Sequence, residues 1–273
     1  MGEQGYPAVL RSLSNPPAAL WARGRVPAGP SIAIVGARSA SGVGCARARA
    51  MAAELAGKGY AIISGGAFGI DAAAHEGALS VGAPTFAVLG CGVDVVYPDR
   101  HGPLFARIAA AGGLLSEYAP GTPPRAGQFP ARNRIIAALA DAVIVVEAAF
   151  RSGALITARL GRSLGKPVLA IPGSAGTDGL LQKGQARLVA SAADVEDVLA
   201  GRQPIAVAPA ESPSGVAATL VAALREGAAS PAHLSRKVGL PLPTVMAALA
   251  EAELDGWIFR SPGNQFEVTR RGC

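Results

Sequence analysis

The residues best suited to binding chemistry in this sequence stand in a glycine-rich turn after a short apolar run. Arg38 lies three positions past the run at residues 32–35, which are Ile, Ala, Ile and Val. A guanidinium group carries a permanent charge and a planar set of donors, which suit a phosphate group. Backbone amides beside glycine can also approach an anion closely. We therefore expect an anion-binding site here, with Gly36, Arg38 and Ser39 as contacts.

A second turn of this kind follows the next apolar run. Residues 64–71 read Ser-Gly-Gly-Ala-Phe-Gly-Ile-Asp and precede a helical pattern at 72–79. Here the glycines expose backbone amides, and the start of the helix adds a partial positive charge. The alternative is a tight connection in which Asp71 caps the helix. With Arg38 nearby we favour a phosphate cradle, whose candidate contacts are Ser64, Gly65, Gly66 and Phe68.

The most informative stretch is Gly-Gln-Phe-Pro-Ala-Arg-Asn-Arg-Ile-Ile at residues 127–136. Its proline suits the first turn of a helix, so Arg132, Asn133 and Arg134 fall in successive positions spread around the helix axis. Some of the three must point inward or toward a ligand, because the isoleucines that follow take the core side. Phe129 just ahead of them is placed to stack on a nucleobase.

An alternative interpretation of the same stretch is purely structural. Phe129 would then pack as a hydrophobic staple, and the arginines would pair with Glu117 or Glu147. Two further groups remain candidates for binding. Ser152 and Gly153 open another helix and form a second possible anion nest, and Arg100 belongs to the segment after the third strand.

The elements that would position these turns are strands alternating with helices. Short apolar runs lie at residues 32–35, 60–64, 85–89, 113–116, 142–147 and 167–171, with helical patterns between them. This alternation predicts an α/β fold with a Rossmann-like, doubly wound, mostly parallel sheet. Ligands bind such sheets at the carboxyl ends of the strands. A dinucleotide site is not expected, because the glycines have the wrong spacing and no acidic residue ends the second strand.

Composition limits the classes of function. The 273 residues carry a net charge of +6, which admits a nucleic acid partner without requiring one. The three cysteines form no metal-ligand or redox pattern, so we expect neither a metal nor a cofactor. The sequence shows no signal peptide and no apolar run long enough to span a membrane. We therefore expect a cytoplasmic protein with reduced thiols and no membrane partner.

The chain divides into four segments by composition. Residues 1–30 are a proline-rich lead-in whose Leu10, Leu13, Leu20 and Trp21 should pack on the main domain. We expect residues 31–200 to form the Rossmann-like domain that carries the candidate binding turns, and residues 201–214 to form a linker with three prolines. Three helical patterns and a hairpin about residues 262–264 make residues 215–273 a small winged-helix-like domain.

This small domain has an unusual charge balance for a DNA reader. From Ser212 onward the chain has six basic and five acidic residues: Arg225, Arg236, Lys237, Arg260, Arg270 and Arg271 against Glu226, Glu251, Glu253, Asp255 and Glu267. Its would-be recognition helix has no Lys or Arg. Because reading a duplex requires several cations directed at phosphates, we favour a protein-contact or weak DNA-binding role.

Several of these motifs, in this order, resemble the DNA-processing protein A family (DprA, also called Smf). They are Val35-Gly-Ala-Arg38, Ser64-Gly-Gly-Ala-Phe-Gly-Ile-Asp71, Tyr97-Pro98, Phe129-Pro-Ala-Arg-Asn-Arg134, Arg151-Ser-Gly153 with Thr157, and Ile171-Pro-Gly173. The resemblance implies a bacterial factor of natural transformation that binds and protects incoming single-stranded DNA. It also implies loading of RecA recombinase onto that DNA, a homodimer and no catalysis.

By the same resemblance Arg38 matches the family's DNA-contacting arginine, while the 64–66 and 132–134 segments match its pocket-lining motifs. The sequence departs from the family in two places. Phe68 stands where the family commonly has a basic residue, and Asp99 precedes Arg100 where a basic residue often follows Tyr-Pro. Either both departures weaken contacts with the DNA backbone, or Phe68 exchanges a phosphate contact for base stacking. Two copies would pair through the end of this domain, near residues 180–189.

The competing hypothesis is an enzyme, a nucleotide phosphoribohydrolase of the lysine decarboxylase-like (LOG) group. Those proteins share a Ser-Gly-Gly turn and an arginine-rich helix, but they carry a Pro-Gly-Gly-x-Gly-Thr-x-x-Glu loop after the next strand. Here the corresponding loop reads Glu-Ala-Ala-Phe-Arg-Ser-Gly from Glu147. Acid–base catalysis requires a positioned carboxylate or histidine, so we expect binding without catalysis.

Overall fold

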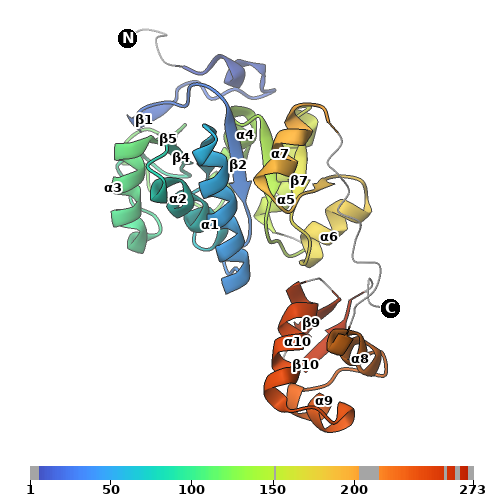
Figure 1. Cartoon of the computed structure of the whole chain (residues 1–273). Helices are drawn as coiled ribbons and strands as arrows, with labels where there is room; N and C mark the ends of the chain where they lie inside the picture. Colours follow the sequence, from blue (N-terminus) through green and yellow to red (C-terminus); the bar gives the residue numbers. More distant parts are fainter. Residues whose placement is uncertain (1–5, 151, 203–214, 255–256, 262–264, 270–273) are drawn as a thin grey trace. The chain divides into compact units, whose positions relative to one another are not determined.

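The computed structural model describes residues 6–150, 152–202, 215–254, 257–261 and 265–269. The chain divides into two compact units, Met1–Pro204 and Ile205–Cys273, and Figure 1 shows the elements of each. From residue 203 onward the expected linker lies outside the described residues. No helix among the described residues is long and apolar enough to cross a membrane.

The larger unit is built on one eight-stranded sheet with the order β1-β5-β4-β3-β2-β6-β7-β8. Its strands are β1 (Trp21–Gly24), β2 (Ser31–Val35), β3 (Ala61–Ser64), β4 (Thr85–Val88), β5 (Gly113–Ser116), β6 (Ala142–Val145), β7 (Val168–Ala170) and β8 (Arg187–Leu188). All neighbouring strands are parallel except β1, which is antiparallel to β5. The expected Rossmann-like, mostly parallel sheet is thus confirmed.

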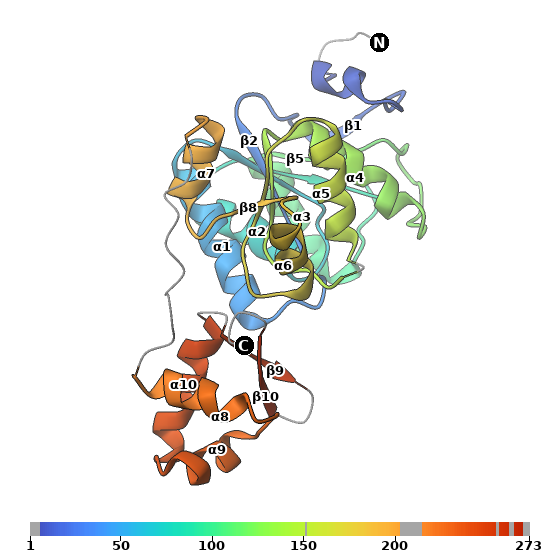
Figure 2. The ribbon, with the colours of Figure 1, turned by 90° about the vertical axis from the view of Figure 1, so that its right-hand side faces the viewer.

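Helices cover both faces of this sheet. They are α1 (Gly42–Gly57), α2 (Ile70–Ser80), α3 (Gly102–Ala111), α4 (Gln128–Leu139), α5 (Gly153–Ser163), α6 (Ala175–Gln182) and α7 (Ala192–Leu199), with single 3-10 turns η1 (Ala8–Ser12) and η2 (Asp99–His101). In β2, Ile32 and Ile34 pack with α1, α2 and α7, whereas Ala33 and Val35 pack with α4 and α5. Figure 2 shows the sheet between these two groups of helices. The alternation of side chains along a buried strand produces this division.

The order of the strands reverses at β2, and this reversal locates the crevice. From β2 the chain adds β3, β4 and β5 on one side, then crosses through α4 to place β6 on the other side of β2. The loops after β2 and β6 therefore leave in opposite directions and open a crevice outside the carboxyl ends of the strands. All the turns singled out in the sequence follow strands at this edge.

Of the four lead-in residues expected to pack on the main domain, three do so. Leu10 and Leu13 are buried and Leu20 packs against the same core, but Trp21 is 42% exposed. The expectation for Trp21 was wrong because residues 21–24 form β1, an outer edge strand in which every residue is exposed. A proline-rich composition gave no signal for this strand.

The smaller unit has three helices followed by a hairpin. They are α8 (Gly215–Leu224), α9 (Pro231–Val238), α10 (Leu242–Leu254), β9 (Ile258–Ser261) and β10 (Gln265–Val268). Its own core includes Leu220, Leu234, Leu249 and Phe266. Ser230 caps α9 by accepting from the amide of His233, as its Ser-Pro sequence predicts. The winged-helix fold is confirmed, while the expected turn at 262–264 lies outside the described residues.

Candidate nucleic-acid interface

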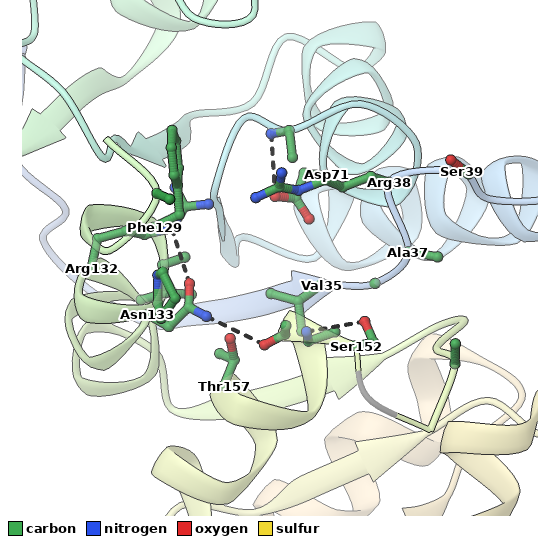
Figure 3. Close-up of a pocket in the computed structure, with 18 of the residues that line it drawn as sticks. Val35, Ala37, Arg38, Ser39, Asp71, Phe129, Arg132, Asn133, Ser152 and Thr157 are labelled. Atoms are coloured by element: carbon green, nitrogen blue, oxygen red, sulfur yellow. Dashed lines mark hydrogen bonds between the residues drawn. The ribbon is translucent and has the colours of Figure 1, made fainter. Parts of the chain in front are cut away.

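Two adjoining cavities open at the carboxyl ends of the parallel strands. The larger has a volume of about 800 Å³ and lies between the loops after β2 and β6 and the start of α4. Among the residues lining it are Gly36, Arg38, Ser39, Asp71, Phe129, Arg132, Asn133, Ser152, Gly153 and Thr157. Figure 3 shows Val35 and Thr157 on one side of this cavity, with Arg38 and Phe129 facing one another.

The smaller cavity, of about 350 Å³, lies on the side of β3 and β4. Its lining includes Gly65, Gly66, Phe68, Tyr97 and Arg100. The two cavities share a wall formed by Arg38, Ala67, Tyr97, Phe129 and Arg132. Four stretches far apart in the sequence therefore contribute to one continuous site.

Arg38 is the exposed cation of the shared wall. Its guanidinium carbon lies 5.5 Å from the centre of the Phe129 ring, within the range of a cation–π contact. The Tyr97 and Phe129 rings lie 5.3 Å apart. Arg38 forms no salt bridge with any residue that the structure describes. Its charge is thus unneutralised, and flat aromatic surfaces stand beside it.

Close packing fixes the turn that carries Arg38. The amide of Ala37 donates to the carbonyl of Glu147 at 2.7 Å, and Ala37 in turn accepts from the amide of Ile70. Gly36 leaves no room for a side chain, because an added Cβ would lie 2.5 Å from Cγ1 of Ile70. Gly69 has a φ of +74°, and its Cβ would lie 2.3 Å from the carbonyl oxygen of Ala37. The glycines thus allow the two turns to meet.

Glu147 has a structural role in this arrangement. Its carboxylate accepts from the amide and the hydroxyl of Ser41, at 3.0 Å and 2.6 Å. Ser41 is the N-cap of α1 and accepts from the amide of Gly44. The carboxylate therefore links β6 to the start of α1 rather than pairing with an arginine, as the structural alternative had supposed.

Arg132 is buried and borders both cavities, and its expected contact with DNA stays a prediction. The guanidinium donates to the carbonyl oxygen of Gly65 at 2.6 Å, to that of Val88, and to Oδ1 of Asn133 at 3.0 Å. Burial lowers the pKa of Arg132, while the negative charge of Asp71 raises it. Because its Nε and Nη1 groups donate to protein oxygens, Arg132 ties α4 to the ends of β3 and β4.

The turn after β3 is also occupied by the protein itself. Oδ2 of Asp71 accepts from the amides of Gly65 and Ala67, at 3.2 Å and 3.3 Å. Those two amides are therefore engaged within the protein, and a phosphate cradle at this turn stays a prediction that depends on its other groups. Asp71 is not the N-cap of α2 either, because Gly69 holds that position. Burial raises the pKa of the Asp71 carboxyl, against the opposing effects of Arg132 and the amide of Ala67.

Two of the expected contacts lie outside both cavities. Ser64 is fully buried, and its hydroxyl donates to the carbonyl of Ile34. Arg134 makes a double salt bridge with Glu117, with both nitrogen–oxygen distances at 2.7 Å. Neither residue lines a cavity, because the Ser64 side chain is enclosed beneath the turn and the Arg134 side chain is directed toward Glu117. For Arg134 the structural alternative, pairing with Glu117, is the one that the structure shows.

The remaining expected residues border the crevice. Ser152 caps α5 by accepting from the amide of Ala154, and Asn133 donates to the carbonyl of Gly153. Phe68 is 43% exposed and its ring meets His101 edge to face at 4.5 Å. Arg100 is exposed and, within the described residues, free of salt bridges.

Sequence reasoning missed two residues of the site. Tyr97, 40% exposed, was noted only as part of a motif, although an aromatic residue in a loop after a strand is a usable signal. Thr157 lies within α5, and its side chain lines the larger cavity while the residue as a whole is buried. Its contribution depends on the position of α5 against α4, for which the sequence has no local signal.

The open α/β sheet, with cavities at its switch point, and the three helices with a hairpin define a Rossmann-like protein with a winged-helix companion. Comparison with known families is more specific. The family described as DNA recombination-mediator protein A matches residues 1–200, and the DprA winged helix domain matches residues 204–264. This chain therefore belongs to the DNA recombination-mediator protein A (DprA/Smf) family.

Individual relatives agree with this assignment. Protein Smf of Escherichia coli strain K12 is 36% identical over 285 residues, which cover 98% of this chain and 76% of that protein. The X-ray structure of DNA processing protein A from Streptococcus pneumoniae has a TM-score of 0.66 and 40% identity, covering 71% of each chain. DNA processing protein A from Helicobacter pylori, described for its single-stranded DNA binding mode, has a TM-score of 0.65 and 34% identity. That match covers 72% of this chain and 93% of that one.

Proposed function

We propose that this protein binds single-stranded DNA in the two adjoining cavities. The observation that carries the proposal is Arg38, an exposed cation that makes no salt bridge with a described residue and faces the Phe129 ring in the wall between the cavities. Proteins that bind single strands combine cations that follow the phosphates with aromatic rings on which bases stack. Here both kinds of group meet at one point. The family and the Helicobacter pylori relative support the same ligand.

Each part of the crevice would make a different contribution. Arg38 and Arg100 would contact phosphates, while Phe129, Tyr97 and Phe68 would stack on bases. Gly36, Ser39, Ser152 and Gly153 would give the strand polar backbone and hydroxyl contacts in the larger cavity. Arg132, Asn133, Gly65 and Gly66 would act by holding the walls in place. Binding of this kind follows the backbone and stacks any base, so it has little dependence on sequence.

The cavities favour binding over catalysis. A phosphoribohydrolase needs a carboxylate or histidine free to move a proton. Asp71, which lines the larger cavity, is occupied by two amides of the neighbouring turn, and Glu147 is occupied by Ser41. We therefore propose a mediator without catalysis. It would protect incoming DNA during natural transformation and load RecA recombinase onto it.

The decisive experiment compares two charge reversals. Arg38→Glu should weaken binding of a labelled oligothymidylate by about tenfold or more in fluorescence anisotropy at low salt, because it replaces a phosphate contact by repulsion. Arg23→Glu is the matched control, since Arg23 is an exposed arginine in the outer strand β1. Melting of both variants should equal that of the parent. If Arg38→Glu binds as tightly as Arg23→Glu, the site has been misassigned.

Two partner proposals depend on separate measurements. We propose a homodimer formed near residues 180–189, where Leu188 in the outer strand β8 is 49% exposed. Sedimentation should then give a dimer at micromolar concentration, and a monomer alone would contradict it.

Loading of RecA should appear as faster assembly of RecA on single-stranded DNA when this protein is present. An unchanged assembly rate would reject that role.

A further inference from the structure

Phe150 is the most exposed large apolar side chain among the described residues. It is 73% exposed, whereas the next values are 49% for Val81 and Leu188. An aromatic ring in water makes no contribution to the core, so packing gives no reason for its place. Its contact with the rest of the protein is slight. The ring lies near Gly179 of α6: if Gly179 carried a Cβ atom, Cε1 of Phe150 would lie 3.7 Å from it.

The loop that carries Phe150 is held firmly. The carbonyl of Ala148 accepts from the amide of Gly176 at 2.7 Å, and the amide of Ala148 donates to the hydroxyl of Ser174 at 3.0 Å. The amide of Ser152 donates to the carbonyl of Ala149 at 3.0 Å. The backbone just before Phe150 is thus held by hydrogen bonds, while its ring is exposed to solvent.

The order of the strands places Phe150 beside the candidate site. Phe129, Tyr97 and Phe68 follow β5, β4 and β3, Arg38 follows β2, and Phe150 follows β6. Neighbouring strands lie about 4.8 Å apart, so the aromatic residues occupy both sides of Arg38 along one edge of the sheet. Ala149, next to Phe150 in the chain, and Ser152 both line the larger cavity. The ring of Phe150 lies near Gly179 of α6, beside that cavity and on the side of the sheet away from the other aromatic residues.

We propose that Phe150 is a further base-stacking platform, which holds a nucleobase of the strand as it leaves the larger cavity past Arg38. This inference rests on the proposed single-strand binding and extends its path toward β6 and β7. The chemistry fits a nucleobase because every base has a flat face and an exposed ring accepts it without sequence preference.

The test uses the full chain and oligothymidylates of increasing length in fluorescence anisotropy. Phe150→Ala should weaken binding of long oligonucleotides by about 5- to 100-fold, the range for loss of one base–aromatic stack. It should leave unchanged the binding of oligonucleotides too short to extend beyond the cavities. Arg38→Glu should weaken binding at every length. Val81→Ala is the matched control, because Val81 is an exposed apolar residue at the far end of α2.

A second variant reports stacking directly. Phe150→Trp should keep the affinity of the parent, and its added indole fluorescence should be quenched by oligothymidylate beyond the signal of Trp21 and Trp257. If the parent binds DNA but Phe150→Ala matches it at every length and Phe150→Trp shows no added quenching, Phe150 has no such role. Loss of self-association in Phe150→Ala with unchanged DNA binding would also overturn the proposal, in favour of a contact between copies. Absence of DNA binding by the parent would instead refute the proposed function.

Discussion

Replacement of Arg132 by methionine separates a structural role from a DNA contact. Arg132 donates to the carbonyls of Gly65 and Val88, and its charge lowers the otherwise raised pKa of the buried Asp71 carboxyl. Methionine is of similar length and carries no charge. In Arg132→Met the two carbonyls lose their donor, and the Asp71 carboxylate loses a positive charge that stabilises it.

The expected cost is large. Removing one partner of a buried charge pair costs about 3–5 kcal/mol, because the other charge is left uncompensated. The total stability of a domain is about 5–15 kcal/mol, so this loss should lower the melting temperature by about 10 °C or more. Arg134→Met is the matched control. In the ion pair of Arg134 with Glu117, the two side chains are 14% and 16% exposed, respectively. Loss of this pair should lower the free energy of unfolding by about 1–2 kcal/mol.

The loss of stability in Arg132→Met should also depend on pH. Burial raises the folded-state pKa of Asp71, and loss of Arg132 raises it further. Between the unfolded and the folded pKa the folded state binds more protons than the unfolded state, so stability falls as pH rises through that window. Arg132→Met should therefore regain stability when the pH is lowered from neutral toward the unfolded pKa of Asp71.

Urea denaturation at pH 5 and pH 7.5, followed by circular dichroism, measures this effect. The double variant Arg132→Met with Asp71→Asn should recover part of the loss at pH 7.5, because no buried carboxylate remains to be compensated. The reasoning is refuted if Arg132→Met is as stable as the parent at both pH values. If that stable variant also fails to bind single-stranded DNA, Arg132 contacts the ligand and does not act mainly through the structure.

Three further results are expected. Gly36→Ala should lower the free energy of unfolding by about 1–3 kcal/mol, because its Cβ would lie 2.5 Å from Cγ1 of Ile70; an unchanged denaturation midpoint would contradict this packing. Arg38→Gln should reduce the slope of log affinity against log salt for oligothymidylate by about 0.7, the value for one phosphate contact, and an unchanged slope would exclude that contact. His75 should stay neutral in the native protein from pH 8 to pH 5, because burial lowers its pKa to about 3, and a titration of its ring by NMR in that range would contradict this. Since unfolded His75 binds a proton below its ordinary pKa, it should also reduce stability as the pH falls through 6 toward 3.

The fold was largely readable from local sequence. The apolar runs at β2, β3, β4, β5, β6 and β7 are short, all but that at β6 have glycine or proline beside them, and strands of a parallel sheet are apolar on both faces. These features are local, so the sequence displays them directly. The outer strands β1 and β8 were missed, because edge strands with exposed residues lack that signal. Trp21 was placed in the core for the same reason.

The sequence by itself determined that Gly36, Arg38, Phe129 and Gly65 would meet at one edge of the sheet, because turns after parallel strands share that edge. Only the tertiary structure decided which of the nearby polar groups are free. Arg38 and Arg132 are the same residue type, yet one is exposed and the other donates to buried carbonyls. That difference depends on where α4 packs against β3 and β4, a long-range contact with no trace in the local sequence. The same packing decides that Asp71 takes the amides that a phosphate would otherwise need.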